Sequence, residues 1–123
     1  MKRIVIDLDG TLTDAQTSDY ENVQPNGEVL RTLREYRKGG FEIVIYTARN
    51  MRTHAGNIGR INALTLPIIH EWLKRHDVPY DEIWVGKPWC GSEGFYVDDK
   101  AIRPDEFCSM SYEQIRELLD IDD

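Results

Sequence analysis

The stretch IVIDLDGTLT, residues 4–13, runs from a short apolar segment directly into two aspartates, a glycine and a threonine. Its apolar residues are mostly β-branched and do not alternate with polar ones, a pattern typical of a strand buried on both faces. Asp7 and Asp9 follow at once, and two carboxylates so close together repel each other unless a cation compensates their charge. The stretch therefore predicts a buried strand that ends either in a solvated turn or at a site that holds a cation.

Strands and amphipathic helices alternate along the rest of the chain. The pattern predicts strands at 3–8, 41–47, 81–86 and 94–99, and helices at 28–38, at about 64–76 and from a Ser111–Gln114 capping box onward. The residues of the last helix expected to face the core are Ile115, Leu118 and Leu119. This order predicts an α/β fold, in which a mainly parallel central sheet is covered by helices on both faces.

Size and charge restrict the class of protein. A length of 123 residues predicts a single domain, 1–123. The net charge of −7 argues against a partner such as long nucleic acid, whose binding surfaces are normally basic. No apolar run approaches the ~20 residues of a membrane span, and the N-terminus lacks the apolar core of a signal peptide. We expect no membrane insertion, a cytoplasmic location, and free thiols at Cys90 and Cys108.

Polar side chains stand at or just after the carboxyl end of every predicted strand: Asp7 and Asp9, Thr47, Lys87, and Asp98 with Asp99. Each alone has an ordinary explanation, such as a turn, a helix cap or a surface lysine. Because the ends of parallel strands meet at one edge of the sheet, we expect these side chains to lie together. Four carboxylates without a cluster of His or Cys favour Mg²⁺, and Mg²⁺ indicates phosphoryl chemistry.

The same residues carry a resemblance to a known family. DLDGT, residues 7–11, resembles the DxDGT motif of the haloacid dehalogenase (HAD) superfamily, and Thr47, Lys87 and Asp98–Asp99 match its other motifs in order. YTARNMRTHAGNIGRINALTLPIIHEWL and VDDKAIRPDEF look like a subgroup without a cap domain, labelled capsule or lipopolysaccharide biosynthesis phosphatases. The resemblance implies a three-layer Rossmann-like HAD fold and a Mg²⁺-dependent phosphatase of polysaccharide biosynthesis.

The resemblance implies roles for the two leading acids. Asp7 is the nucleophile, whose carboxylate attacks phosphorus to form an aspartyl-phosphate. Asp9 is the general acid that protonates the leaving oxygen and then the base that activates water. Dehalogenases of the superfamily do not need this second acid, so Asp9 favours phosphate over halide chemistry.

The other motif residues are implied to hold the phosphoryl group and the metal. Thr47 and the amides around Gly10 and Thr11 bind phosphoryl oxygens, and Lys87 neutralises their charge. The implied metal ligands are Asp7, Asp9 through its main-chain carbonyl, Asp98 and Asp99. Asp99 is the favoured second carboxylate, while Asp98 either shares the metal or orients Lys87.

Neither polar stretch is long enough to fold as a cap domain, for which ~50 residues is the usual minimum. Residues 10–26 allow only a flap, and 48–62 only a loop. The site is therefore expected to be open, or covered by a second copy in a homodimer. Arg49, Arg52 and Arg60 are expected to line the substrate entrance, and a solvated loop is the alternative.

Three functions remain open on sequence alone. The first is a phosphatase that hydrolyses a small phosphate ester, such as a sugar phosphate or a glycan precursor. The second is a nucleotidase or polynucleotide phosphatase, since acidic charge counts against long nucleic acid but not against nucleotides. The third is a non-enzymatic binding protein that retains the HAD fold.

Overall fold

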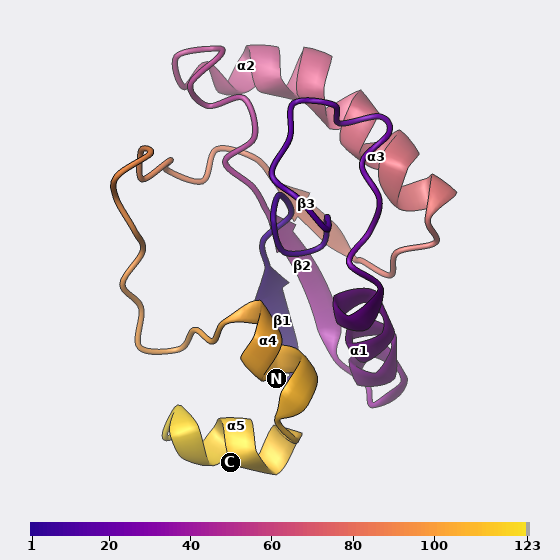
Figure 1. Cartoon of the computed structure of the whole chain (residues 1–123), viewed down its shortest axis with the longest axis vertical. Helices are drawn as coiled ribbons and strands as arrows, with labels where there is room; N and C mark the ends of the chain where they lie inside the picture. Colours follow the sequence, from indigo (N-terminus) through magenta and orange to yellow (C-terminus); the bar gives the residue numbers. More distant parts are fainter. Residues whose placement is uncertain (123) are drawn as a thin grey trace. The chain divides into compact units, whose positions relative to one another are not determined.

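The computed structural model describes residues 1–122, which form two compact units, Met1–Trp89 and the segment from Cys90 onward (Figure 1). The first contains the sheet, and the second contains two short helices. The chain has an α/β fold without a cap domain in its described part, as predicted. Its organisation as a single domain stays a prediction.

The sheet of the first unit has three parallel strands, β1 (Arg3–Ile6), β2 (Glu42–Tyr46) and β3 (Glu82–Trp84), in the order β1-β2-β3. Ile4 pairs with Ile43, and Ile45 pairs with Ile83. The central strand is buried on both faces, which matches its continuous apolar sequence. The three predicted strands are confirmed, and their carboxyl ends point the same way.

The fourth predicted strand is wrong. Residues 94–99 lie in an irregular segment of the second unit, where Phe95 is 79% exposed and Val97 is 88% exposed. Aromatic and β-branched residues favour a strand only when a neighbouring strand pairs with their backbone. The described part of the second unit contains no strand that could do so.

Helix α1 (Gly27–Lys38) follows the prediction closely. The side chain of Asn26 accepts a hydrogen bond from the Val29 backbone N–H and so caps the first turn. Val29, Leu30 and Leu33 are buried at helical spacing.

The helical segment after β2 is longer than predicted. It begins with α2 (Ile58–Arg60), passes through a π-helical turn (Ile61–Thr65) and continues as α3 (Leu66–Arg75). The predicted irregular stretch 48–62 therefore ends at Asn57, whose side chain caps the Arg60 backbone N–H. The sequence hides this start because its first turns are rich in glycine, asparagine and arginine.

Residues 10–26, which we call the strap, form no helix and no regular strand (Figure 1). The strap is fastened to α3 by two hydrogen bonds. The indole N–H of Trp72 donates to the Val23 carbonyl at 2.7 Å, and Arg75 donates to the Glu21 carbonyl. The strap is therefore held in place by helix packing, although its sequence suggests only a loose flap.

The second unit contains α4 (Pro104–Ser109) and α5 (Tyr112–Leu118). The capping box of Ser111 and Gln114 is confirmed, and Ile115 is buried as expected. The expectation that Leu118 faces the core is wrong, because this residue is 54% exposed at the end of a helix too short to bury a second row. No helix among the described residues is long and apolar enough to span a bilayer.

Candidate active site

Three predicted site residues meet at the carboxyl edge of the first unit's sheet. Asp7 follows β1, Thr47 follows β2, and Lys87 follows β3. The Lys87 Nζ lies 3.6 Å from Asp7 Oδ1, and the Lys87 backbone N–H donates to the Thr47 carbonyl at 3.1 Å. Parallel register brings these groups together although 80 positions separate Asp7 from Lys87 in the chain.

Asp7 sits in an environment suited to a reactive carboxylate. Burial raises the pKa of Asp7, while the Lys87 ammonium and the Thr11 hydroxyl partly oppose this effect by favouring the charged form. Thr11 Oγ1 donates to Asp7 Oδ2 at 3.1 Å. The half-buried side chain is 35% exposed, so it is partly shielded from water and still reachable. Such a carboxylate can act as a nucleophile or as a ligand for a hard cation.

The loop after Asp7 turns back on itself. The backbone N–H groups of Thr11, Leu12 and Thr13 all donate to the Leu8 carbonyl. Gly10 has a φ of +80° and donates its N–H to Thr13 Oγ1 at 2.8 Å. In this conformation the amides of Gly10 and Thr11 already have protein acceptors, so their role in binding phosphate stays a prediction.

Arg49 does not line an open entrance, which corrects the expectation from sequence. Its side chain is 1% exposed and forms a two-pronged ion pair with Asp9, from Nη2 to Oδ1 at 2.6 Å and from Nε to Oδ2 at 3.1 Å. The guanidinium carbon lies 4.1 Å from the centre of the Tyr20 ring. The fork of arginine fits a carboxylate and its flat face fits an aromatic ring, so these two contacts offset part of the cost of taking the charge out of water.

Arg52 and Arg60 are exposed, as the predicted entrance requires. Arg52 lies over the Trp89 ring at 5.6 Å, and Trp89 itself is 46% exposed. The two arginines come from different parts of the segment, since Arg52 lies in the loop before α2 and Arg60 lies in α2 itself. A role for either in substrate binding stays a prediction.

The oxygens near Asp7 suit magnesium, which prefers carboxylate and carbonyl oxygens to nitrogen or sulfur ligands. Asp7 offers its carboxylate, and Asp9 offers its main-chain carbonyl. In this structure the Asp9 carbonyl accepts a hydrogen bond from Gln16 Nε2 at 2.9 Å. The described residues contain no group of three or more His, Cys, Asp and Glu side chains arranged to hold a metal. The donor chemistry therefore fits magnesium, with part of the ligand set still to be supplied.

Asp98 and Asp99 belong to the second unit and are exposed. Asp98 Oδ1 accepts a hydrogen bond from the Lys100 backbone N–H at 2.8 Å, which is the ordinary behaviour of an aspartate in a turn. Their assignment as metal ligands stays a prediction.

A family model for haloacid dehalogenase-like hydrolases matches residues 4–71, more than half of the chain. The chain belongs to this family. The match covers β1, β2 and the loops that carry Asp7, Asp9 and Thr47. The predicted HAD resemblance and the hydrolase class are confirmed, whereas the capsule or lipopolysaccharide subgroup stays a prediction.

Two crystal structures are similar to this HAD-like hydrolase. A protein from Vibrio cholerae is 64% identical, with a TM-score of 0.95 and 98% of each chain covered. The D,D-heptose 1.7-bisphosphate phosphatase from B. bronchiseptica, complexed with magnesium and phosphate, is 17% identical, with a TM-score of 0.46 over 69% of this chain and 49% of that one. The second likeness is too low to support an argument about activity. No curated protein matches the sequence significantly.

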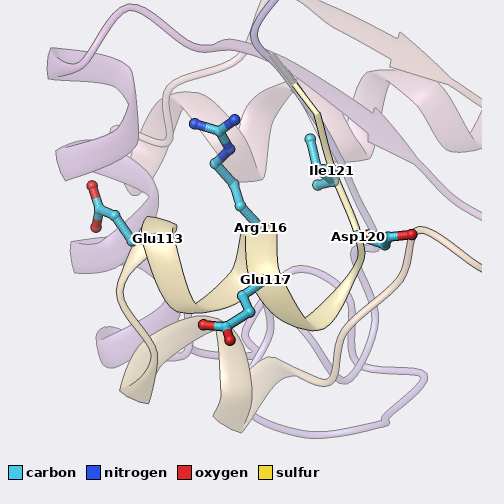
Figure 2. A pocket seen from close by; sticks show the side chains of 5 residues that line it. All are labelled: Glu113, Arg116, Glu117, Asp120 and Ile121. Atoms are coloured by element: carbon cyan, nitrogen blue, oxygen red, sulfur yellow. The ribbon is translucent and has the colours of Figure 1, made fainter.

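A shallow hollow on the second unit carries none of the predicted site residues of this HAD-like hydrolase. Figure 2 shows the side chains that line it, which come from α5 and the residues just after it: Glu113, Arg116, Glu117, Asp120 and Ile121. The three carboxylates and one arginine are typical of a solvated helix face.

Two residues that contact Asp9 or its partner were not predicted from the sequence. Gln16 bonds the Asp9 carbonyl, and Tyr20 stacks on Arg49. Gln16 gives no local signal, because a glutamine in a polar stretch is ordinary. Tyr20 could have been noticed as an aromatic residue within that polar stretch, but its partner depends on the path of the strap.

Proposed function

We propose that this hydrolase is a magnesium-dependent phosphatase that cleaves a phosphate monoester, such as a sugar phosphate or a glycan precursor, through an aspartyl-phosphate on Asp7. The observation that supports this most strongly is the Asp7 carboxylate, half-buried at a strand end with Lys87 Nζ at 3.6 Å and the Thr11 hydroxyl at 3.1 Å. A nucleophilic carboxylate beside a cation is the arrangement that attack on an anionic phosphoryl group requires.

In the proposed mechanism, an Asp7 oxygen bonds to phosphorus as the ester oxygen leaves, and Asp9 gives that oxygen a proton. In this mechanism Lys87 offsets negative charge on the phosphoryl oxygens, and Thr47, which is buried at the end of β2, contributes its hydroxyl to them. Water then attacks phosphorus, Asp9 takes its proton, and Asp7 is released. Asp7 and the Asp9 carbonyl would hold magnesium, with a carboxylate from 98–99 as the predicted further ligand, and the bound ion would supply charge neutralisation.

The proposed substrate class follows from the absence of a cap domain in the described residues. Without a cap, the leaving group is not enclosed by a second domain, so an ester larger than a simple metabolite can reach Asp7. The exposed Arg52 and Trp89 offer a cation and a ring face to such a leaving group. We also propose that a homodimer covers the site, which light scattering tests, and that the protein has a cytoplasmic location.

The test is hydrolysis of a panel of sugar phosphates, nucleotides and an aryl phosphate with magnesium, comparing wild type, Asp7→Asn and Asp81→Asn. Asp81 precedes β3 at the opposite edge of the sheet, so it is a matched control for loss of a carboxylate. We expect Asp7→Asn to abolish turnover and acid-stable labelling by radioactive phosphate ester, while Asp81→Asn keeps both.

The folding control for Asp7→Asn is thermal unfolding in EDTA. The pKa of Asp7 is higher in the folded protein than in the unfolded chain. Asp7 therefore stabilises the fold at a pH below its pKa in the unfolded chain, and this stabilisation is lost as the pH rises through its pKa in the folded protein. The variant should therefore unfold at or above the wild-type temperature at neutral pH. Wild type that binds magnesium yet hydrolyses no member of the panel would favour the non-enzymatic alternative, and preference for nucleotides would favour the nucleotidase.

A further inference from the structure

The carboxylate of Asp9 is held in one orientation by Arg49. Both carboxylate oxygens accept hydrogen bonds from the guanidinium, at 2.6 Å from Nη2 and at 3.1 Å from Nε. A two-pronged contact fixes the plane of the carboxylate as well as its distance, which a single hydrogen bond cannot do. The direction in which Asp9 points is therefore set by where Arg49 lies.

Arg49 is in turn held by the strap, residues 10–26. The Tyr20 ring covers the guanidinium, with its centre 4.1 Å from the guanidinium carbon. The strap is fastened on both sides of this contact, because Val23 accepts from Trp72 of α3 and Gln16 donates to the Asp9 carbonyl. The strap thus acts on Asp9 in two ways. Gln16 contacts the main chain of Asp9 directly, and Tyr20 contacts Arg49, which in turn holds the side chain of Asp9.

A purely structural role explains Arg49 poorly. Its third nitrogen, Nη1, is buried without a hydrogen-bond partner in the described part of the chain. An arginine that only filled space would lose less by extending to the surface, since burying a guanidinium with an unsatisfied donor is unfavourable. Among the described residues its ion pair is with Asp9.

We propose that Arg49 is a positioning residue for proton transfer by Asp9, and that Tyr20 holds Arg49 in place for this purpose. The inference rests on the proposed function. In the first half-reaction the Asp9 proton passes to the leaving oxygen as the bond from phosphorus to that oxygen breaks and the Asp7–phosphorus bond forms. Asp9 is then a carboxylate, which is the form that the guanidinium fork binds.

In the second half-reaction Asp9 takes a proton from water, as the water oxygen bonds to phosphorus and the Asp7–phosphorus bond breaks. Arg49 therefore holds the charge that appears on Asp9 between the two proton transfers and keeps the carboxylate aimed for the second. Arg49 itself touches neither the substrate nor the phosphoryl group.

The experiment uses substrates with different leaving groups. An alkyl leaving group, as in a sugar phosphate, needs a proton when it departs, whereas p-nitrophenolate is stable without one. Arg49→Lys keeps the charge and loses the fork. We expect the kcat of Arg49→Lys on a sugar phosphate to fall about 10²-fold, which is the effect of a small misplacement of a reacting group. The fall in kcat on p-nitrophenyl phosphate should be smaller, and KM should change little.

Two comparisons separate positioning from a general loss of structure. If Arg49 acts through Asp9, the double variant Arg49→Lys/Asp9→Asn is no slower than Asp9→Asn alone. Arg31→Lys is the matched control for the substitution, since Arg31 is 61% exposed on α1 and pairs with Glu35. It should match wild type on both substrates.

Tyr20 keeps the proposal testable if Arg49→Lys does not fold. Tyr20→Phe retains the ring over the guanidinium and should behave as wild type, whereas Tyr20→Leu should reproduce the leaving-group dependence in weaker form. Equal losses on both substrates, or additive losses in the double variant, overturn this inference and leave the proposed function intact. A wild type that hydrolyses no phosphate ester overturns the proposed function, and this inference falls with it.

Discussion

The fastening of the strap to α3 can be tested by replacing Trp72 with phenylalanine. Trp72 is 1% exposed, and its indole N–H donates to the Val23 carbonyl at 2.7 Å. Phenylalanine keeps most of the apolar contact but has no donor, so the carbonyl is left buried without its partner, which costs about 1–3 kcal/mol. The lost volume of about 40 Å³, at about 24 cal/mol per Å³, adds about 1 kcal/mol. We therefore expect the free energy of unfolding to fall by about 2–4 kcal/mol.

The assay is urea unfolding followed by far-UV circular dichroism, together with limited proteolysis under native conditions. Trp84→Phe is the matched control, because Trp84 is 58% exposed and its indole N–H donates to the side chain of the half-buried Glu82. That variant should lose less than about 0.5 kcal/mol, as surface substitutions usually do. Trp72→Phe should also be cut earlier within the strap. If the two variants are equally stable and equally resistant to protease, the hydrogen bond to Val23 does not hold the strap.

Three further predictions follow from single contacts. Asp81→Asn is expected to lower the thermal unfolding temperature at neutral pH, because hydrogen bonds from Arg37 and from a β2 backbone N–H lower the pKa of Asp81. Asp81 therefore stabilises the fold at a pH above its pKa in the unfolded chain, and this stabilisation is lost as the pH falls through its pKa in the folded protein. The unfolding temperatures of variant and wild type should converge in acid, and a difference that stays constant with pH would contradict the reasoning. Gln16→Ala removes the hydrogen bond to the Asp9 carbonyl, so magnesium binding measured by calorimetry should tighten about three- to tenfold, and unchanged affinity would mean that this carbonyl is not a ligand. Gly10→Ala places a side chain on a backbone with a φ of +80°, so urea unfolding should show a loss of about 1–2 kcal/mol, and full stability would show that the loop relaxes.

The sequence was sufficient to predict those elements whose caps and buried faces depend on residues close together in the chain. The capping box of Ser111 and Gln114 was predicted because it is a contact between residues three positions apart, and it forms. The spacing of apolar residues predicted the strand 3–6 and the helix after Asn26, because this spacing shows whether an element buries one face or both. For the same reason the carboxyl edge could be anticipated with Asp7 and Lys87 on it, since parallel strands have one direction.

Elements that depend on a distant partner were not predictable in this way. The segment 94–99 has the composition of a strand, but in the described structure no neighbouring strand pairs with it, and it stays irregular. Leu118 lies on the expected helical spacing, yet α5 ends before a second buried row can form.

The sequence by itself determined the alternation of strands and helices, the family motifs and the placement of Asp7 at a strand end, because these are properties of neighbours in the chain. Tertiary structure alone decided what surrounds Asp9. Arg49, 40 positions away, buries its guanidinium against this carboxylate and beneath Tyr20 rather than facing solvent in its loop. The physical reason is that burying a guanidinium is costly unless partners such as this carboxylate and this ring meet it, and no local pattern specifies that meeting.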